Sequence, residues 1–298
     1  MQDAQNDLGQ GQACGSGERL VTFAWLRQSG ENAKGQQILE STVTVPQIRS
    51  RRKGSYGFDA PYLLPILGIL LFVNVANGVV SRTAWPFVGA LAIAVCAGCG
   101  LYASRRGKFE VWAELFQKLK LRGDERILDL GCGRGAVLLL AARQLTTGRA
   151  VGVDAWRRGD QSGNEAEATR RNAIAEEVAD RVEVQTGDMT ALPFEDSSFD
   201  LVVSNVALHN VEGRAGRCRA IEEAVRVLRP GGQLMIADLW ATSLYQMHLA
   251  KLGMTDITRR NLGWRMWWSG PWLATRLVSA TKPAITYGTT VPDDCAPG

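Results

Sequence analysis

Two uncharged apolar runs, almost back to back, restrict the fold of this chain more than any other feature. They cover residues 62–80 and 85–103, and each is 19 residues long. As α-helices they would each span about 28 Å, close to the roughly 30 Å hydrocarbon core of a bilayer. Because only four residues connect them, the sequence predicts an antiparallel two-helix membrane hairpin over residues 62–103.

Basic residues flank the pair of runs unevenly. Arg82 is the only charge between the runs, whereas seven basic residues lie just outside them: Arg49, Arg51, Arg52, Lys53, Arg105, Arg106 and Lys108. Loops rich in Lys and Arg stay in the cytoplasm. This pattern predicts a two-pass protein, in the inner or plasma membrane if bacterial, with both ends in the cytoplasm. The alternative is a soluble helical pair that caps a binding site, which the polar Asn74 and Asn77 would favour.

The composition of the whole chain excludes several classes of protein. The chain has 34 basic and 30 acidic residues, too even a balance for a dedicated nucleic-acid binder. Cys96 and Cys99 form a CxxC, but the absence of a second pair and the presence of only two histidines predict no metal site. Residues 1–55 are polar and are predicted to form a disordered extension, and residues 283–298 a C-terminal tail.

Residues 109–282 alternate between helical and strand patterns. Apolar residues on one face predict a helix over 109–121. Five strands are expected at 126–130, 150–154, 182–186, 199–205 and 233–238, and three helices between them at 136–144, 165–179 and 218–228. Pro230, Gly231 and Gly232 are interpreted as a helix stop and turn. Such alternation predicts an α/β fold, a doubly wound and mostly parallel sheet with its ligand at the carboxyl ends of the strands.

Three glycines follow the first predicted strand at alternate positions: Gly131, Gly133 and Gly135. Glycine lets the backbone turn sharply and lets a ligand approach the main chain closely. Gly131, Gly133 and Ala136 also satisfy a loose dinucleotide fingerprint. However, Asp129 lies two residues before the first glycine, where its carboxylate would repel a pyrophosphate and hold an ammonium group.

The run ILDLGCGRG, residues 127–135, closely resembles the first motif of the Rossmann-like (class I) S-adenosylmethionine (SAM) dependent methyltransferases. Arg134 stands where many members have threonine. Further segments resemble later motifs of the same family, in the same order: Asp154 at the end of the second strand, then residues 186–189, 192–203 and 227–232. The resemblance covers roughly residues 109–282.

The resemblance implies a seven-stranded sheet, SAM as cofactor and a role for each matched residue. Asp154 is expected to bind both ribose hydroxyls, Asp188 the adenine amino group, and Met189 the adenine ring. Asp129 is expected to hold the ammonium group. The remaining predicted cofactor contacts are Gly131, Cys132, Gly133, Gly135, Ala155 and Asn205.

The segment after the fourth strand, residues 204–210, would face the methyl donor. It lacks the Asn/Asp-Pro-Pro-Tyr/Phe tetrapeptide of many nitrogen methyltransferases and instead resembles the ubiquinone/menaquinone C-methyltransferases, of methyltransferase type 11. Imidazole titrates near neutrality, which makes His209 the best candidate for a general base and His248 a weaker one. Four tryptophans, at positions 264, 267, 268 and 272, are interpreted as core or membrane-surface residues or as an aromatic wall for substrate.

The predicted function is a membrane-anchored SAM-dependent methyltransferase. Its acceptor would be a small, lipophilic molecule: a quinone, isoprenoid, phenol or lipid head group, methylated by in-line displacement. Two alternatives remain, a non-catalytic SAM-binding sensor or scaffold and a protein methyltransferase. The partners expected are this acceptor and the lipid bilayer, with no nucleic acid, and the oligomeric state is left open.

Overall fold

The computed structural model describes residues 52–157 and 159–284. The predicted tail, 283–298, and the predicted extension, 1–55, therefore lie almost entirely outside the described residues. The four residues of the extension that are described do not fit a disordered segment. The amides of Lys53 and Gly54 both donate to the Glu176 carboxylate, at 3.0 and 2.9 Å, and the Ser55 amide donates to Asn172 Oδ1 at 2.8 Å.

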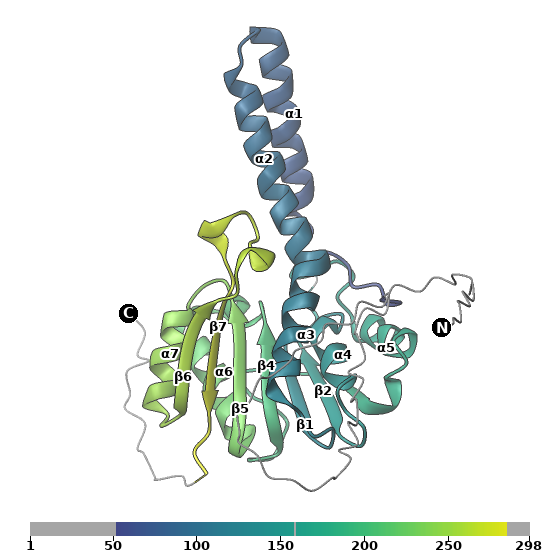
Figure 1. Cartoon of the computed structure of the whole chain (residues 1–298), viewed down its shortest axis with the longest axis vertical. Helices are drawn as coiled ribbons and strands as arrows, with labels where there is room; N and C mark the ends of the chain where they lie inside the picture. Colours follow the sequence, from purple (N-terminus) through teal and green to yellow (C-terminus); the bar gives the residue numbers. More distant parts are fainter. Residues whose placement is uncertain (1–51, 158, 285–298) are drawn as a thin grey trace, which may run out of the picture. The chain divides into compact units, whose positions relative to one another are not determined.

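A seven-stranded sheet forms the centre of the domain, in the order β3-β2-β1-β4-β5-β7-β6 (Figure 1). Strands β1 to β5 pair in parallel, whereas β7 is antiparallel to both β5 and β6. The strands are β1 (Arg126–Leu130), β2 (Arg149–Asp154), β3 (Val182–Thr186), β4 (Phe199–Asn205), β5 (Leu228–Asp238), β6 (Thr255–Asn261) and β7 (Arg276–Thr281). The predicted α/β, doubly wound, mostly parallel sheet is confirmed.

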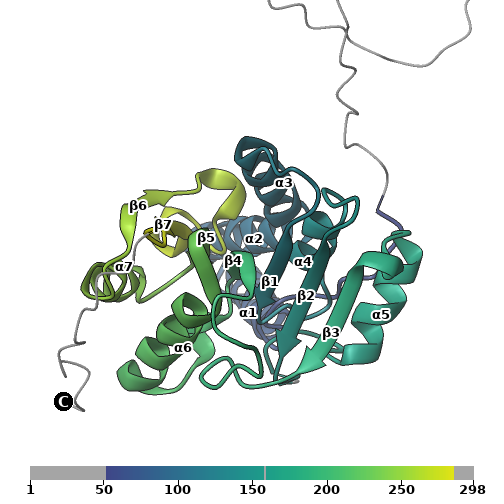
Figure 2. The same cartoon turned by 90° about the horizontal axis from the view of Figure 1, so that it is seen from below.

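Helices cover both faces of this sheet, as the view from below shows (Figure 2). Alternate strand residues face opposite sides, so Ile127 of β1 packs in one core cluster and Leu128 in the other. The first cluster includes residues of α3 (Lys108–Leu119) and α4 (Ala136–Ala142), and α5 (Ala166–Ala175) also contributes to it. The second includes residues of α6 (Gly213–Val227) and α7 (Thr242–Lys251).

The two apolar runs form α1 (Leu63–Ser81) and α2 (Trp85–Tyr102), which pack against each other. Helix α2 continues through a π-helical turn, η1 (Ala103–Gly107), directly into α3. Both apolar helices are long and apolar enough to cross a membrane. Their side chains are unusually exposed, with Phe72 72% and Val95 58% accessible. A helical pair buried in a soluble core would not show such exposure.

Several predicted boundaries shift. Helix α4 ends two residues early, α5 covers only Ala166–Ala175 of the predicted 165–179, and α6 begins five residues before the predicted start. Pro230–Gly232 were interpreted as a helix stop and turn, but the structure places them in a strand. Helix α6 already ends at Val227, and these residues lie within β5, where the register with β4 slips between the pairs Phe199–Leu228 and Leu201–Gln233.

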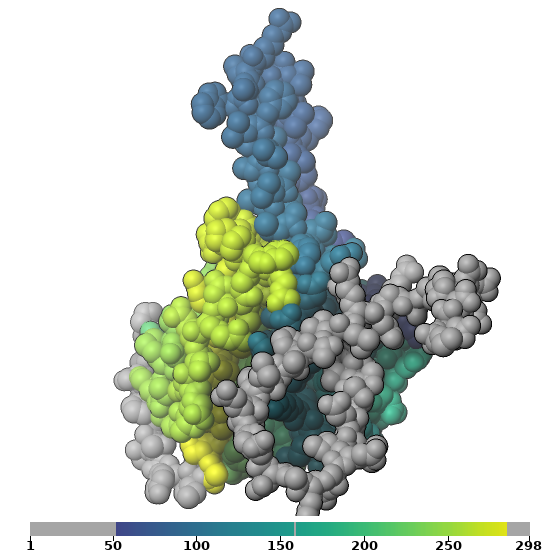
Figure 3. Space-filling view, in the orientation of Figure 1, coloured from purple at the N-terminus to yellow at the C-terminus, as the bar shows by residue number. Residues whose placement is uncertain are grey.

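The four tryptophans lie in the connection between β6 and β7, which packs against the base of the hairpin (Figure 3). Trp264 stacks on Tyr102 at the end of α2, with ring centroids 5.1 Å apart. A Cβ on Gly107 would lie only 1.7 Å from the Arg265 carbonyl oxygen, so the backbones of η1 and this connection meet closely. Trp264 remains 61% exposed at this contact, and Trp272, in the same connection, is 72% exposed.

Candidate active site

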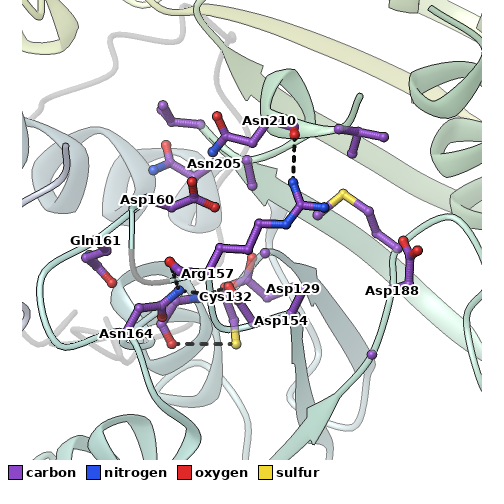
Figure 4. A pocket seen from close by; sticks show the side chains of 18 of the residues that line it. Asp129, Cys132, Asp154, Arg157, Asp160, Gln161, Asn164, Asp188, Asn205 and Asn210 are labelled. Carbon is purple, nitrogen blue, oxygen red and sulfur yellow. Dashed lines mark hydrogen bonds between the residues drawn. The ribbon is translucent and has the colours of Figure 1, made fainter. Parts of the chain in front are cut away.

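A cavity of about 290 Å³ opens at the carboxyl ends of β1, β2 and β4. Parallel α/β sheets bind ligands at this edge, because the strand ends and helix starts leave a crevice there. Figure 4 shows the side chains that point into it. All the predicted cofactor residues except Gly135 line this cavity: Asp129, Gly131, Cys132, Gly133, Asp154, Ala155, Asp188, Met189 and Asn205.

The glycine loop between β1 and α4 forms the floor of the cavity. Gly131, Gly133 and Gly135 all have positive φ, at +72°, +50° and +85°, a region that disfavours residues with a side chain. A Cβ on Gly131 would lie 2.3 Å from the Cβ of Ala207, on the opposite wall. Gly135 immediately precedes α4 and does not line the cavity. Its positive φ lets the chain turn from the loop into the helix.

Asp129 is the most unusual residue of this site. It is 1% exposed, and its Oδ2 has no hydrogen-bond partner among the described residues. Burial raises the pKa of this carboxyl group to about 7, and the nearby Asp154 charge adds to the rise, while a hydrogen bond from the Leu138 backbone opposes it. An unpartnered buried carboxylate oxygen is costly, so it marks a place where a positively charged donor fits.

Asp154 joins the glycine loop to the loop that follows β2. Its Oδ2 accepts a hydrogen bond from the Gly133 amide at 2.8 Å, and its Oδ1 accepts one from the Trp156 amide at 2.6 Å. Asn164 Nδ2 also donates to Oδ1, at 3.3 Å (Figure 4). A carboxylate offers about four acceptor positions, which leaves capacity for a ribose hydroxyl.

The other predicted residues complete the walls. The Thr190 amide donates to Asp188 Oδ1 at 2.8 Å, which lowers the pKa of Asp188 and keeps it ionised. Asn205 Oδ1 accepts a hydrogen bond from Trp112 Nε1 of α3 at 2.8 Å, which fixes the amide orientation. Burial raises the pKa of the Cys132 thiol, so this side chain stays neutral in the wall.

Sequence reasoning missed a polar cluster at the hairpin side of the cavity. Lys108 is only 2% exposed, and its Nζ donates to Asp59 Oδ2 at 2.7 Å. Gln161 Nε2 donates to Asp59 Oδ1 at 3.0 Å, and Gln161 Oε1 accepts from the Arg134 amide in the glycine loop at 2.9 Å. Residues 59 and 108 lie on either side of the hairpin in the sequence, and only the fold brings them together.

Arg157 was also missed, although it lies across the cavity. Its guanidinium donates to the Asn210 carbonyl oxygen at 3.1 Å and so connects the loop after β2 with the segment after β4 (Figure 4). The sequence signal was weak, because Arg157 lies in a loop without a recognisable motif.

The two histidines lie outside the residues that line this cavity. His209 is adjacent to it, next to the lining residue Asn210, and its Nδ1 lies 2.6 Å from Oδ1 of the fully buried Asp238. His248 is buried, with its Nε2 2.9 Å from Glu222 Oε1. None of the four tryptophans of the 264–272 segment lines the described cavity, so they do not form an aromatic wall in it.

The fold and this site together have the arrangement that the resemblance to the class I methyltransferases predicts. A glycine loop and three acids surround one cavity, and the residues fit SAM: Asp129 lies in β1, Asp154 ends β2 and Asp188 follows β3. Asp129 offers a carboxylate to an ammonium group, Asp154 has acceptor capacity for ribose, and Asp188 and Met189 line the remaining wall.

Comparison with known proteins agrees. The model of a methyltransferase domain matches residues 128–236. Demethylmenaquinone methyltransferase of Symbiobacterium thermophilum is 35% identical over 134 residues, 44% of this chain and 50% of that protein. The 27-O-demethylrifamycin SV methyltransferase of Amycolatopsis mediterranei is 35% identical over 123 residues, 40% of each chain. A SAM-dependent methyltransferase structure from Aquifex aeolicus has a TM-score of 0.46 at 16% identity, covering 57% of this chain and 88% of that one.

Residues 128–236 of this chain match a methyltransferase domain, and the residues that line its cavity fit SAM as the cofactor. The matched segment covers only half or less of the length of these curated relatives.

SAM affinity is expected to depend on pH through Asp129. Its pKa of about 7 in the cofactor-free protein means that it is increasingly protonated below pH 7. A cationic group binds the ionised carboxylate, so binding lowers this pKa and releases a proton. Affinity should approach its full value about one pH unit above this pKa and decrease by up to about tenfold for each pH unit below it. Calorimetry measures the affinity, and buffers of different ionisation enthalpy report the proton release. A flat profile would contradict this assignment.

Proposed function

We propose that this protein is a membrane-anchored methyltransferase that uses SAM to methylate a small, lipophilic acceptor. The observation that carries the catalytic part is the unpartnered, buried Oδ2 of Asp129 in a cavity built on the glycine loop. A sensor would also bind SAM, but no described feature favours a sensor over an enzyme.

When bound, SAM supplies an electrophilic methyl group. The residues of this chain bind SAM and orient it. Asp129 would hold the ammonium group, and Asp154 would hold the ribose while its bond to the Gly133 amide keeps the glycine loop in place. Asn205, fixed by Trp112, lines the cavity at the end of β4. Such positioning of two reactants can supply much of the rate enhancement.

The proposal of membrane anchoring rests on the exposed apolar side chains of the hairpin. Apart from their contacts with α2, most apolar side chains of α1 are exposed, for example Phe72 at 72% and Val79 at 64%. Interfacial tryptophans are typical of membrane proteins, and the exposed Trp264 stacks on Tyr102 at the base of the hairpin. We place both ends of the hairpin and the catalytic domain on the cytoplasmic side. The names of the relatives specify quinone and rifamycin acceptors, which supports a small-molecule substrate.

We also propose that His209 removes a proton from the substrate when the atom to be methylated carries one. Asp238 holds Nδ1, and this leaves Nε2 as the basic atom. Replacing His209 with glutamine is expected to lower kcat by about 100-fold or more, the usual range for a lost general base. SAM affinity, measured by calorimetry, should stay unchanged. Full turnover of the variant would remove His209 from the mechanism.

Lipid extracts test the acceptor class. Mass spectrometry of extracts from cells with and without the gene should reveal one lipophilic species that gains the mass of one methylene group only when the gene is present. Reintroducing a variant with Asp129 replaced by asparagine should not restore that species. Identical extracts, together with a methylated protein in the expressing cells, would replace this proposal with a protein methyltransferase.

A further inference from the structure

A second pocket, of about 700 Å³, lies between residues 52–58 and the η1 turn at the base of the hairpin. Four arginines line it: Arg52, Arg105, Arg106 and Arg134. None of the described residues that line it is acidic. Four positive charges around one pocket repel one another, and an anion bound between them would offset this repulsion.

The hydrogen bonds described for Arg52 and Arg134 go to neutral oxygen atoms, and the Glu176 carboxylate acts on Arg52 only through its charge. The Arg134 guanidinium donates to the carbonyl oxygens of Ser55, at 2.8 Å, and of Ser162, at 3.0 Å. Arg52 donates to the Arg105 carbonyl oxygen. Among the described residues, none of the four arginines forms an ion pair with a carboxylate.

Aromatic rings hold two of the guanidinium groups in the pocket wall. Arg52 lies 3.7 Å from the ring centroid of Phe109, and Arg105 lies 4.0 Å from that of Phe58. Stacking of this kind restrains the planar group while its N–H donors remain directed outward. Burial also lowers the pKa of Arg52, a cost that a bound anion would offset. The pocket therefore has restrained, planar donors, which suit the oxygens of a phosphate group.

The position of the pocket at the base of the hairpin indicates which kind of phosphate compound would bind there. Arg105 and Arg106 follow the last apolar residues of α2 within one turn. Tyr102, at the end of α2, stacks on the exposed Trp264, and such aromatic residues lie at the level of lipid headgroups. In a membrane-anchored protein the arginine pocket would therefore lie at the headgroup layer of the cytoplasmic leaflet, which is rich in anionic lipid.

We propose that this arginine pocket binds the phosphate of one anionic phospholipid headgroup. The inference rests on the membrane anchoring proposed above but not on methyl transfer. It assigns Arg105 and Arg106 a specific ligand in addition to their effect on topology. Arg134 belongs to the glycine loop, so the test leaves it unchanged.

The test uses the full-length protein in a neutral detergent. Short-chain phosphatidylglycerol, short-chain phosphatidylcholine and inorganic phosphate are titrated separately, and binding is measured by calorimetry. Phosphatidylglycerol is expected to bind at least about tenfold more tightly than either of the other two. In R105Q/R106Q this preference should fall by about tenfold or more, because each lost contact is a charge-assisted hydrogen bond. The matched control R82Q/K118Q removes the same charge elsewhere and should keep the preference.

The remaining outcomes are distinct. Equal binding of the two lipids, or an equal loss in the control variant, would overturn the proposal. Inorganic phosphate that binds as tightly as phosphatidylglycerol would overturn the headgroup assignment in favour of a soluble anion. SAM binding to the same samples is measured in parallel. A failure of the methyltransferase proposal would appear as lost SAM binding or turnover, whereas a failure of this one would leave both intact.

Discussion

Replacing Asp129 with asparagine is expected to weaken SAM binding about 100-fold, or about 2.7 kcal/mol, within the range for a lost hydrogen bond to a charged group. The substitution keeps the size of the side chain and removes the carboxylate whose Oδ2 has no partner in the described protein. Calorimetry with the wild type and the variant at pH 8 measures the difference. The pH dependence of SAM affinity should disappear in the same variant.

The stability of the variant separates binding from folding. In the cofactor-free wild type at pH 8, the buried Asp129 is ionised against its raised pKa, so the charge destabilises the folded state. The asparagine that replaces it would carry no charge, and the Tm without SAM should equal or exceed that of the wild type. A matched control is Asp200→Asn in β4, where the carboxylate pairs with Arg229, and this variant should keep its SAM affinity. Wild-type affinity in the Asp129 variant would contradict the cofactor assignment.

Two arginines placed in the middle of the hairpin are expected to remove the protein from membranes. Phe72 and Val95 lie near the centres of α1 and α2 and are 72% and 58% exposed. At the centre of a spanning helix each arginine costs about 2.5–3.5 kcal/mol, so Phe72→Arg with Val95→Arg costs about 5–7 kcal/mol of insertion. Fractionation should move the double variant out of the membrane pellet, whereas the wild type needs detergent for release.

The control places the same residue at the end of the same helix. Val80 is 83% exposed and lies two residues before Arg82, at the hairpin turn. Arginine at a membrane interface reaches the headgroups, so Val80→Arg should remain in the membrane fraction. Wild-type protein in the soluble fraction without detergent would contradict anchoring and favour the soluble helical cap.

The cofactor loop could be predicted because its constraints are local. Gly131 and Gly133 need positive φ, and Asp129 and Asp154 end adjacent parallel strands, so sequence spacing alone brings them to one edge of the sheet. The parallel strands were similarly clear, since each is a short apolar run beside a turn.

The hairpin side of the cavity could not be predicted in this way. Asp59 and Lys108 are 49 positions apart and meet only because α1 and α2 return the chain to its starting point. Gln161 reaches Asp59 from a loop after β2, and no periodicity marks a residue of this kind. These contacts depend on tertiary packing and not on local pattern.

The predicted ends of helices and strands are wrong where the sequence carries two conflicting signals. Gly213 and Gly216 obscured the first turn of α6, because glycine is a poor helix former in isolation. Pro230 and the two glycines that follow it signal a turn, yet β5 absorbs them as an irregularity in its register with β4. Strands β6 and β7 were expected only from the family resemblance, since exposed polar residues in β6 hide any apolar alternation.

We propose above all that this protein transfers a methyl group from SAM to a lipophilic small molecule at a membrane. The most direct test incubates purified full-length protein, in bilayer nanodiscs, with methyl-tritiated SAM and a lipid extract from the native membrane. The label is then counted in the organic phase and in the protein. We expect label in the organic phase with the wild type and about 100-fold less with Asp129→Asn, at a SAM concentration below the Kd of the wild type. Label confined to polypeptide, or no transfer to any fraction by a wild type that binds SAM, would contradict it.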